Sequence, residues 1–499
     1  MNEFPFHNAC PDAYPDPDRK IASPARRAFL RRSSQLTLTG TALPFALNLA
    51  AMGEAAAFEA NDYKALVCVF LNGGNDYANT VVTYDDPSYN AYATIRGGTG
   101  QAGGGCALAK SALAPTLLNP TAPLPDGRQY ALNPAMGALA LLFNSGKAAV
   151  QLNVGPLVVP LTRAQFEGAD RHSYPLPARL MSHSDQQSVW MSSGGEGTTV
   201  GWGGRIGDLA LASNGSSVFT CISATGNAVF LSGQQAIPYQ VSTGGAVALN
   251  AVKSNVYGST AIRTAMSTLL QESSTHALEN DYNRVTARSV ASEAQVTSAL
   301  AGATLSTAFP TTTLGSQLKI VARMIAARNS LNVRRQVFFV SMGGFDLHDN
   351  LMSQHPTVLA ALSDAMAAFH QATVEMGISS QVTAFTASDF GRTLAVNGTG
   401  ADHGWGSHHF MVGGAVKGQA FYGTAPPVSI GNTTATSDQW HIGQGRLLPS
   451  TSVDQYAATL ARWFGVADAE LDGILPNLRN FGTGAGRGDY PRDLGFMRT

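Results

Sequence analysis

Residues 336–350 read QVFFVSMGGFDLHDN, and they open the stretch of sequence that decides the fold. Two related blocks follow it, QVTAFTASDFGRT at 381–393 and ADHGWGSHHFMVGG at 401–414. In the first two blocks, a short apolar run with β-forming residues ends abruptly and is followed by Gly and Asp. In the third block, Asp402 and His403 lead into the apolar run. The pattern predicts strands with Asp and His side chains gathered at their ends.

The segment between the first two runs predicts a helix. Its apolar residues recur at helical spacing, Pro356 lies near its start and Gly377 follows its end. Strand, helix and strand in this order predict a right-handed crossover between parallel strands. Ligands bind such sheets beyond the carboxyl ends of the strands. Because carboxylates and neutral imidazoles bind zinc and similar divalent ions, the stretch predicts a metal site at this edge of the sheet.

A continuous apolar run at 64–71, KALVCVFL, predicts another strand, covered on both faces. The sequence NGGND follows it at 72–76, so Gly-Gly and an acid again come after a strand. Such a sequence is also typical of a simple turn. The repetition of the same form at 343–346 favours the functional interpretation, in which Asp76 joins the metal site.

Residues 182–190, SHSDQQSVW, are typical of the start of a helix. A side chain at this position would be exposed beside backbone N–H groups that can hold an anion. Ser182 and Ser184 are therefore candidate nucleophiles, and the sequence does not decide between them. Ser and Asp are also the commonest helix caps, so a plain capping role is the alternative.

The first 57 residues predict export. Residues 26–31 read RRAFLR, which has the twin-arginine form, and a moderately apolar stretch then leads to AAA at 55–57. We expect residues 1–57 to be a disordered N-terminus plus a twin-arginine signal peptide, and the protein to be periplasmic or secreted. The alternative is a basic turn before a buried or membrane helix, which Pro44 disfavours.

The composition excludes some partners. The formal net charge is −1, which gives no electrostatic case for binding nucleic acid. After residue 57, no segment is apolar enough to span a bilayer, so we expect no stable membrane insertion. The sequence does not predict the oligomeric state.

We expect residues 58–499 to form one α/β domain in which about 210–310 is an inserted subdomain of helices and short strands. Within it, an alanine-rich helical stretch is expected to turn four apolar side chains inward: Leu269, Leu270, Leu278 and Tyr282. Cys106 and Cys221 either pair as a disulfide or stay free, and the sequence leaves both alternatives open.

Together these motifs resemble the family known as domain of unknown function 1501. The motifs that carry the resemblance are FLNGGNDYANTVV, GGFDLHDN, SDFGRT, DHGWGSHHFMVGG and SVDQYAATLARWFGV, and it covers essentially the whole mature chain. That family is similar to the alkaline phosphatase and sulfatase superfamily, as a distant branch. The resemblance implies an alkaline-phosphatase-like three-layer sandwich with a largely parallel central sheet.

The same resemblance implies roles for individual residues. Five side chains correspond to metal ligands: Asp76, Asp346, His348, Asp389 and His403. The segment from Ser182 to Ser184 corresponds to the nucleophile segment. Two departures are that Phe390 follows Asp389 where many relatives have His, and that the sulfatase nucleophile motif is absent. The implied cofactor is a divalent metal, zinc in the first place, with manganese, calcium or magnesium as alternatives.

The expected function is that of an exported metal-dependent hydrolase acting on phosphate or sulfate esters, small or polymeric. The ion would lower the pKa of a water or a Ser hydroxyl. Arg392 would bind an ester oxygen, or would instead form an ion pair with Asp389 or Asp402. The alternative is a catalytically inactive secreted binding or assembly protein on the same fold, with at most a structural metal.

Overall fold

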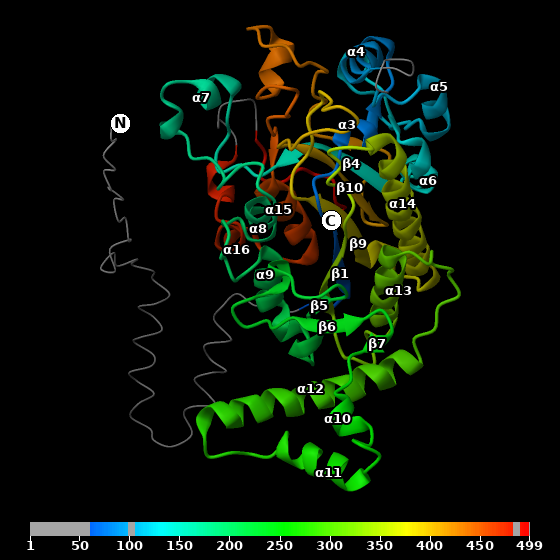
Figure 1. The fold of residues 1–499 in the computed structure, drawn as a ribbon, viewed down its shortest axis with the longest axis vertical. Coiled ribbons are helices and arrows are strands. Elements are labelled where there is room, and N and C mark those ends of the chain that lie inside the picture. The colour runs from blue at the N-terminus through cyan, green and yellow to red at the C-terminus, as the bar shows by residue number, and fades with distance from the viewer. Residues whose placement is uncertain (1–59, 98–104, 483–489, 499) are drawn as a thin grey trace, which may run out of the picture. The chain divides into compact units, whose positions relative to one another are not determined.

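A ten-stranded, mostly parallel sheet forms the centre of the fold (Figure 1). The computed structural model describes residues 60–97, 105–482 and 490–498, so the predicted signal peptide lies outside the described residues. The strand order is β11-β4-β10-β9-β1-β8-β5-β6-β7, β12 pairs with β4, and β2 and β3 form a separate antiparallel pair. The strands are β1 (Lys64–Leu71), β2 (Val81–Thr83), β3 (Tyr130–Leu132), β4 (Ala148–Gly155), β5 (Cys221–Ser223), β6 (Tyr239–Ser242), β7 (Gly245–Ala246), β8 (Arg335–Met342), β9 (Val382–Ser388), β10 (Ser407–Gly413), β11 (Phe421–Tyr422) and β12 (Thr451–Ser452).

Fourteen α-helices lie in the described part of the chain. None of them combines the length and the apolar character needed to cross a membrane. The helices are α3 (Tyr77–Thr80), α4 (Asp86–Arg96), α5 (Lys110–Leu113), α6 (Gly137–Asn144), α7 (Arg163–Glu167), α8 (His183–Ser192), α9 (Trp202–Ala210), α10 (Asn250–Lys253), α11 (Thr260–Leu269), α12 (Ala277–Ala301), α13 (Thr313–Ala326), α14 (Leu351–Glu375), α15 (Val453–Phe464) and α16 (Asp468–Ile474).

Strand β1 lies in the middle of the sheet, between β8 and β9 and parallel to both. Because successive side chains of a strand point to opposite faces, its residues alternate between two hydrophobic cores. Ala65, Val67 and Val69 belong to the core that also holds α6, α13 and α14. Leu66 and Phe70 belong to the core that holds α9, α15 and α16. Helices therefore cover both faces (Figure 1), and the continuous apolar run at 64–71 is confirmed as a fully buried strand.

The register of the sheet brings the functional loops to one edge. Leu71, the last residue of β1, pairs with Met342 at the end of β8 and with Ser388 at the end of β9. The loops that follow the three strands therefore begin at the same level. Strand β10 runs antiparallel to β9, so the residues before Ser407 return to this edge as well. The predicted strand–helix–strand unit is confirmed as β8, α14 and β9.

Residues 210–310 supply both strands and helices. Strand β5 pairs in parallel with β8, and β6 with β5, so part of this region extends the central sheet. The inserted-subdomain boundary stays a prediction. The expectation of inward-facing side chains was wrong for Leu269, Leu278 and Tyr282, which are 63%, 77% and 62% exposed. Leu269 ends α11, which has no buried residue and so covers no core. Leu278 and Tyr282 lie in the first turns of α12, before its first buried residue, Asn283.

The cysteines of the described residues are unpaired. Cys68, Cys106 and Cys221 are all free and buried, so the disulfide alternative for Cys106 and Cys221 was wrong. Burial raises the pKa of the Cys221 thiol far above its usual value. A buried neutral thiol behaves as a small apolar side chain, which explains its place in the core beside α9.

The buried Asp454 of α15 makes stability depend on pH. Burial raises the pKa of its carboxyl from 3.8 to about 6, although Ser193 and the Asn477 N–H donate to Oδ1. The folded protein therefore binds this proton more tightly than the unfolded chain, and stability falls as the pH rises from about 4 to 6. We expect Asp454→Asn to raise the free energy of unfolding by about 2–3 kcal/mol at pH 8.

Urea unfolding of the variant and the wild type at pH 4.5 and pH 8 measures this difference. The gain should fall to about 1 kcal/mol at pH 4.5, where the wild-type carboxyl is protonated in the folded protein but still mostly ionised in the unfolded chain. An equal difference at both pH values, or a less stable variant at pH 8, would contradict the explanation.

Candidate metal centre

Three side chains from distant parts of the chain meet beyond the carboxyl ends of β1, β8 and β9: His183, Asp346 and His403. One ligand atom from each lies within 4.8 Å of the other two. His183 Nε2 lies 3.5 Å from Asp346 Oδ2, and His403 Nε2 lies 3.3 Å from Asp346 Oδ1. In a tetrahedral zinc site with bonds of about 2.0 Å, the ligand atoms are about 3.3 Å apart. The spacing of these side chains therefore fits one divalent ion.

The orientation of His183 is fixed by a buried carboxylate behind it. His183 Nδ1 lies 2.6 Å from Asp389 Oδ2, and Asp389 is fully buried. Because a carboxylate only accepts hydrogen bonds, Nδ1 carries the proton and donates it. The Nε2 atom of the neutral ring then presents a lone pair toward Asp346. This atom is buried and has no hydrogen-bond partner, so its lone pair is available to bind a metal ion.

Asp389 itself is held by two more groups. Gln187 Nε2 donates to Oδ2 at 3.0 Å, one helical turn after His183 on α8. The Gly73 N–H donates to both carboxylate oxygens at 3.2 Å. The hydrogen bond from His183 to Asp389 also raises the pKa of His183, so in the absence of an ion a proton competes for Nε2.

His403 is oriented in the same way by a backbone carbonyl. Its Nδ1 lies 2.8 Å from the Met181 carbonyl oxygen, which can only accept, so Nδ1 donates and Nε2 presents a lone pair. Burial lowers the pKa of His403, and the charges of Arg392 and His183 lower it further. The ring is therefore neutral near pH 7. Met181 has a φ of +70°, a left-handed conformation that is rare for such a residue and that places its carbonyl here.

Asp346 is kept ionised by a buried arginine. Burial raises the pKa of Asp346, but the hydrogen bond and the charge of Arg392 outweigh this effect, and the pKa is lowered. Arg392 is fully buried, and its five N–H groups are all engaged. They point to Gly73 O, Gly74 O, Ala401 O, His348 Nε2 and Asp346 Oδ1. Arg392 therefore anchors the site, and its ion-pair partner is Asp346 rather than Asp389 or Asp402.

The Gly-Gly pair after β1 allows this close packing. Gly73 has a φ of +115°, and a Cβ there would lie 2.5 Å from the Asp346 backbone nitrogen. Gly74 has a φ of +81°, and a Cβ there would lie 2.4 Å from the Phe390 ring. The Phe390 ring packs 4.8 Å from the His183 ring and 4.5 Å from the His403 ring, measured between centroids. Phe390 thus supplies an apolar ring that supports two imidazoles.

His348 lies at the solvent side of the cluster. Its Nε2 is 3.0 Å from His403 Nε2 and 3.2 Å from Asp346 Oδ1. Its Nδ1 is 3.6 Å from Asp402 Oδ1. The side chain is nearly half exposed. His348 therefore borders the cluster from the open side, beside an acid that can orient it.

The structure brings four of the five predicted ligands together: Asp346, His348, Asp389 and His403. Asp389 lies behind His183 and acts through it. Asp76 is not in the cluster, because both of its oxygens bond the Arg96 guanidinium, at 2.5 and 2.8 Å, and Oδ1 also caps α3. A buried carboxylate needs such a partner, and sequence spacing gave no sign of Arg96.

The predicted nucleophile segment contributes an imidazole to the cluster. Ser182 Oγ donates to Asp185 Oδ2 at 2.9 Å and lies 3.5 Å from Ser184 Oγ. Ser184 is exposed. Among the described residues, neither hydroxyl has a hydrogen bond to the cluster. His183 was missed by sequence reasoning, although its place between two serines at a predicted helix start was a usable signal.

The next pair of histidines also stays outside the cluster. His408 and His409 are both buried in β10. The Asn153 N–H donates to His408 Nδ1 at 3.0 Å, and His409 packs against Trp190 and Tyr456. Their role is structural.

Comparisons with known proteins identify the family of the chain. The family model described as "Protein of unknown function (DUF1501)" matches residues 63–475. A search of curated proteins finds no match. The solved structure titled "Crystal structure of Ps i-CgsB in complex with k-i-k-neocarrahexaose" aligns with 84% of this chain and 77% of its own, at 9% identity and a TM-score of 0.31. A likeness this low carries no argument about this chain.

The buried Asp76–Arg96 pair should be a stability element that the metal cluster does not need. Arg96→Met leaves a buried carboxylate without its partner, and we expect the free energy of unfolding to fall by about 3–5 kcal/mol. Denaturant titration measures the change. The matched control is Asp76→Asn/Arg96→Met, which removes both charges and should recover most of the loss. A single variant within about 1 kcal/mol of the wild type would contradict this role.

Proposed function

The chain belongs to the DUF1501 family, and we propose that it is an exported metal-dependent hydrolase of phosphate or sulfate esters, built on an alkaline-phosphatase-like fold. The observation that carries the proposal is the convergence of His183, Asp346 and His403. Both imidazoles have their Nδ1 atoms tied to acceptors, so both Nε2 lone pairs face one ionised carboxylate. Such a donor set, at the carboxyl edge of a mostly parallel sheet, supports a divalent-metal site.

The chemistry of the donors favours zinc among divalent metals. Two imidazole nitrogens and one carboxylate oxygen suit zinc, whereas calcium and magnesium prefer oxygen ligands, and manganese binds such a site more weakly. A zinc ion bound there would polarise an ester oxygen and lower the pKa of a water molecule. A site with three protein ligands keeps a position open for these partners.

We assign His348 the role of general base beside this site. Its Nε2 faces the cluster from the solvent side and can take a proton from the attacking water. Asp402, 3.6 Å from Nδ1, is positioned to orient the ring and to stabilise its charged form. Arg392 keeps Asp346 ionised and fixes the loop after β1, so it acts as a positioning residue.

Water is the nucleophile in this proposal. The Ser182 hydroxyl donates a hydrogen bond to Asp185, and Ser184 is exposed. The residue of this segment that faces Asp346 is His183. The serines then have a structural role at the start of α8.

Zinc content and ester hydrolysis, measured together, separate the ligands from the base. We expect the zinc-loaded wild type to hydrolyse p-nitrophenyl phosphate or p-nitrophenyl sulfate and to hold one zinc ion per chain. His183→Ala should lose both properties, because a ligand is gone. His348→Ala should keep the zinc and lose about 100-fold or more in kcat, which is the usual size of a general-base contribution.

Two further variants make the test specific. Ser182→Ala and Ser184→Ala should each keep at least a tenth of the wild-type kcat, and a loss above 100-fold in either would restore the serine nucleophile. Loss of zinc from folded His348→Ala would make His348 a ligand and contradict its role as a base. Circular dichroism of each variant controls for folding.

One observation favours the rival function of a catalytically inactive binding or assembly protein. Every N–H group of Arg392 is engaged within the protein, so this cation has no donor left for an ester oxygen. A zinc-loaded wild type that hydrolyses neither ester would support this rival and overturn the hydrolase proposal.

The location outside the cytoplasm belongs to the same proposal. The sequence RRAFLR at 26–31, followed by an apolar stretch and AAA at 55–57, supports export by the twin-arginine route. Replacing Arg26 and Arg27 together by Lys should retain the chain in the cytoplasm, which cell fractionation measures. Unchanged export of this variant would contradict the assignment of the signal.

A further inference from the structure

A hollow of about 360 Å³ adjoins the metal cluster along the same edge of the sheet. Three of its walls come from the carboxyl ends of β1, β8 and β5, through Asn72, Ser341 and Thr225. Helix α8 lines it through Ser184 and Gln187, and the segments 196–198 and 227–229 complete the lining. This volume lies within the range of small-molecule sites, and ligands of such sheets bind at this edge. We call the hollow the edge groove.

The edge groove and the cluster share a hydrogen-bond network. Gln187, which lines the groove, donates to Asp389, and Asp389 holds His183. Asn72 precedes Gly73, whose N–H also donates to Asp389. A molecule in the edge groove would therefore lie directly beside the groups that orient the cluster.

The lining of the edge groove combines polar side chains with apolar surface and is almost uncharged. Amide and hydroxyl side chains predominate, and Asn72 has no side-chain hydrogen bond to any other described residue. Met191, Val229 and Phe339 add apolar surface. Of the described lining residues, Glu196 alone is charged, and it lies 3.9 Å from the Arg179 guanidinium.

This lining selects against two kinds of ligand. A polyanion such as a nucleic acid would find no Lys or Arg in the groove to neutralise its charges. A lipid chain would cover the Asn72 amide, which has no side-chain hydrogen bond to another described residue, and burying it unpaired costs free energy. An uncharged ligand with many hydroxyl groups satisfies the polar side chains and rests its C–H surface on the apolar ones.

We propose that the edge groove binds the uncharged, hydroxyl-rich body of the substrate, a carbohydrate, while the ester group lies at the cluster. This inference rests on the proposed function. Asn72 and Ser341 then determine specificity, because their side chains lie at the ends of β1 and β8. The Asn72 amide is free to bond a sugar hydroxyl, and Ser341 Oγ, which shares a hydrogen bond with Thr225 Oγ1 at 3.1 Å, keeps a lone pair that can accept one.

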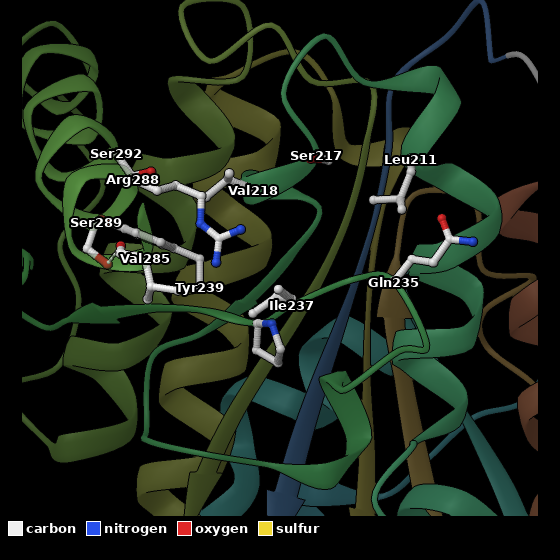
Figure 2. Close-up of a pocket in the computed structure, with 11 residues that line it drawn as sticks. Leu211, Ser217, Val218, Gln235, Ile237, Tyr239, Val285, Arg288, Ser289 and Ser292 are labelled. Atoms are coloured by element: carbon white, nitrogen blue, oxygen red, sulfur yellow. Dashed lines mark hydrogen bonds between the residues drawn. The ribbon is translucent and has the colours of Figure 1, made fainter. Parts of the chain in front are cut away.

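A second hollow, of about 260 Å³, supplies a matched control (Figure 2). It lies between α12 and the chain around β6, and it shares no lining residue with the edge groove or the cluster. Gln235 and Ser289 line it and provide one amide and one hydroxyl. A double alanine substitution there removes the same chemical groups as Asn72→Ala/Ser341→Ala removes from the edge groove.

The test compares sugar esters with esters that lack a sugar. The zinc-loaded wild type should hydrolyse galactose 6-sulfate or glucose 6-phosphate with a kcat/KM at least tenfold above that for the matching p-nitrophenyl ester. Asn72→Ala/Ser341→Ala should raise the KM for the sugar ester about tenfold, the effect of losing one or two hydrogen bonds to a neutral ligand. Gln235→Ala/Ser289→Ala should behave as the wild type, and all three proteins should hold the same amount of zinc.

Two results would overturn the inference and leave the proposed function standing. One is hydrolysis of p-nitrophenyl esters without any hydrolysis of the sugar esters. The other is an edge-groove variant that keeps the wild-type selectivity. Either result would mean that the groove does not bind the sugar part of the substrate.

If no ester is hydrolysed, the proposed function fails and binding decides the inference separately. Calorimetric titration with lactose, cellobiose and maltose then uses uncharged probes that need no reaction. If the wild type binds one of these sugars and Asn72→Ala/Ser341→Ala binds it at least tenfold more weakly, the result supports a carbohydrate groove. No binding of any of the three sugars overturns it.

Discussion

The buried carboxylate of Asp389 is the constraint on which the rest of the site depends. The oxygens of a fully buried carboxylate must accept hydrogen bonds from protein donors, because they cannot reach bulk water. Its donors come from two separate elements: the loop after β1, through Gly73, and the first two turns of α8, through His183 and Gln187. Asp389 itself follows β9. One group therefore ties the sheet edge to the helix that carries a candidate ligand.

The second constraint is the pairing of Arg392 with Asp346. The guanidinium reaches the two carbonyls of the Gly-Gly loop and the carboxylate after β8, so it joins the ends of β1, β8 and β9 from within. Asp389 and Arg392 lie three residues apart and act in opposite senses. Asp389 accepts hydrogen bonds from His183, Gln187 and the Gly73 N–H. Arg392 donates hydrogen bonds to the Gly73 and Gly74 carbonyls and to Asp346. The two together leave the Nε2 atoms of His183 and His403 and the carboxylate of Asp346 facing a common point.

Much of this arrangement could be predicted from the sequence. The apolar runs predicted the central strands closely, and the Gly, Asp and His residues after them predicted which edge carries the site, because parallel strands end together. The sequence could not distinguish Asp76 from Asp346, since both follow a strand and Gly-Gly. The difference lies in Arg96, twenty residues along the chain, which takes both oxygens of Asp76. Pairings of this kind are set by tertiary packing and leave no local pattern.

His183 is a cluster residue that the local sequence pattern did not identify. A helix start rich in Ser and Asp predicts caps or a nucleophile, and local reasoning selects the hydroxyls. Which side chain of α8 enters the site is decided by the rotation of the helix, and that rotation is fixed by Gln187 and His183 bonding the same carboxylate. The expectation for Leu269, Leu278 and Tyr282 failed for a related reason, because an amphipathic pattern does not say whether a core lies beside it.

The most direct test of the central claim is X-ray absorption at the zinc edge on the zinc-loaded protein. The structure predicts a first shell of two imidazole nitrogens and carboxylate oxygen at about 2.0–2.2 Å, with no sulfur. The Asp389→Asn variant should keep this shell and bind zinc about 10–100-fold more weakly, because Asp389 acts through His183. A wild-type protein that retains no zinc, or a shell without imidazole, would contradict the account.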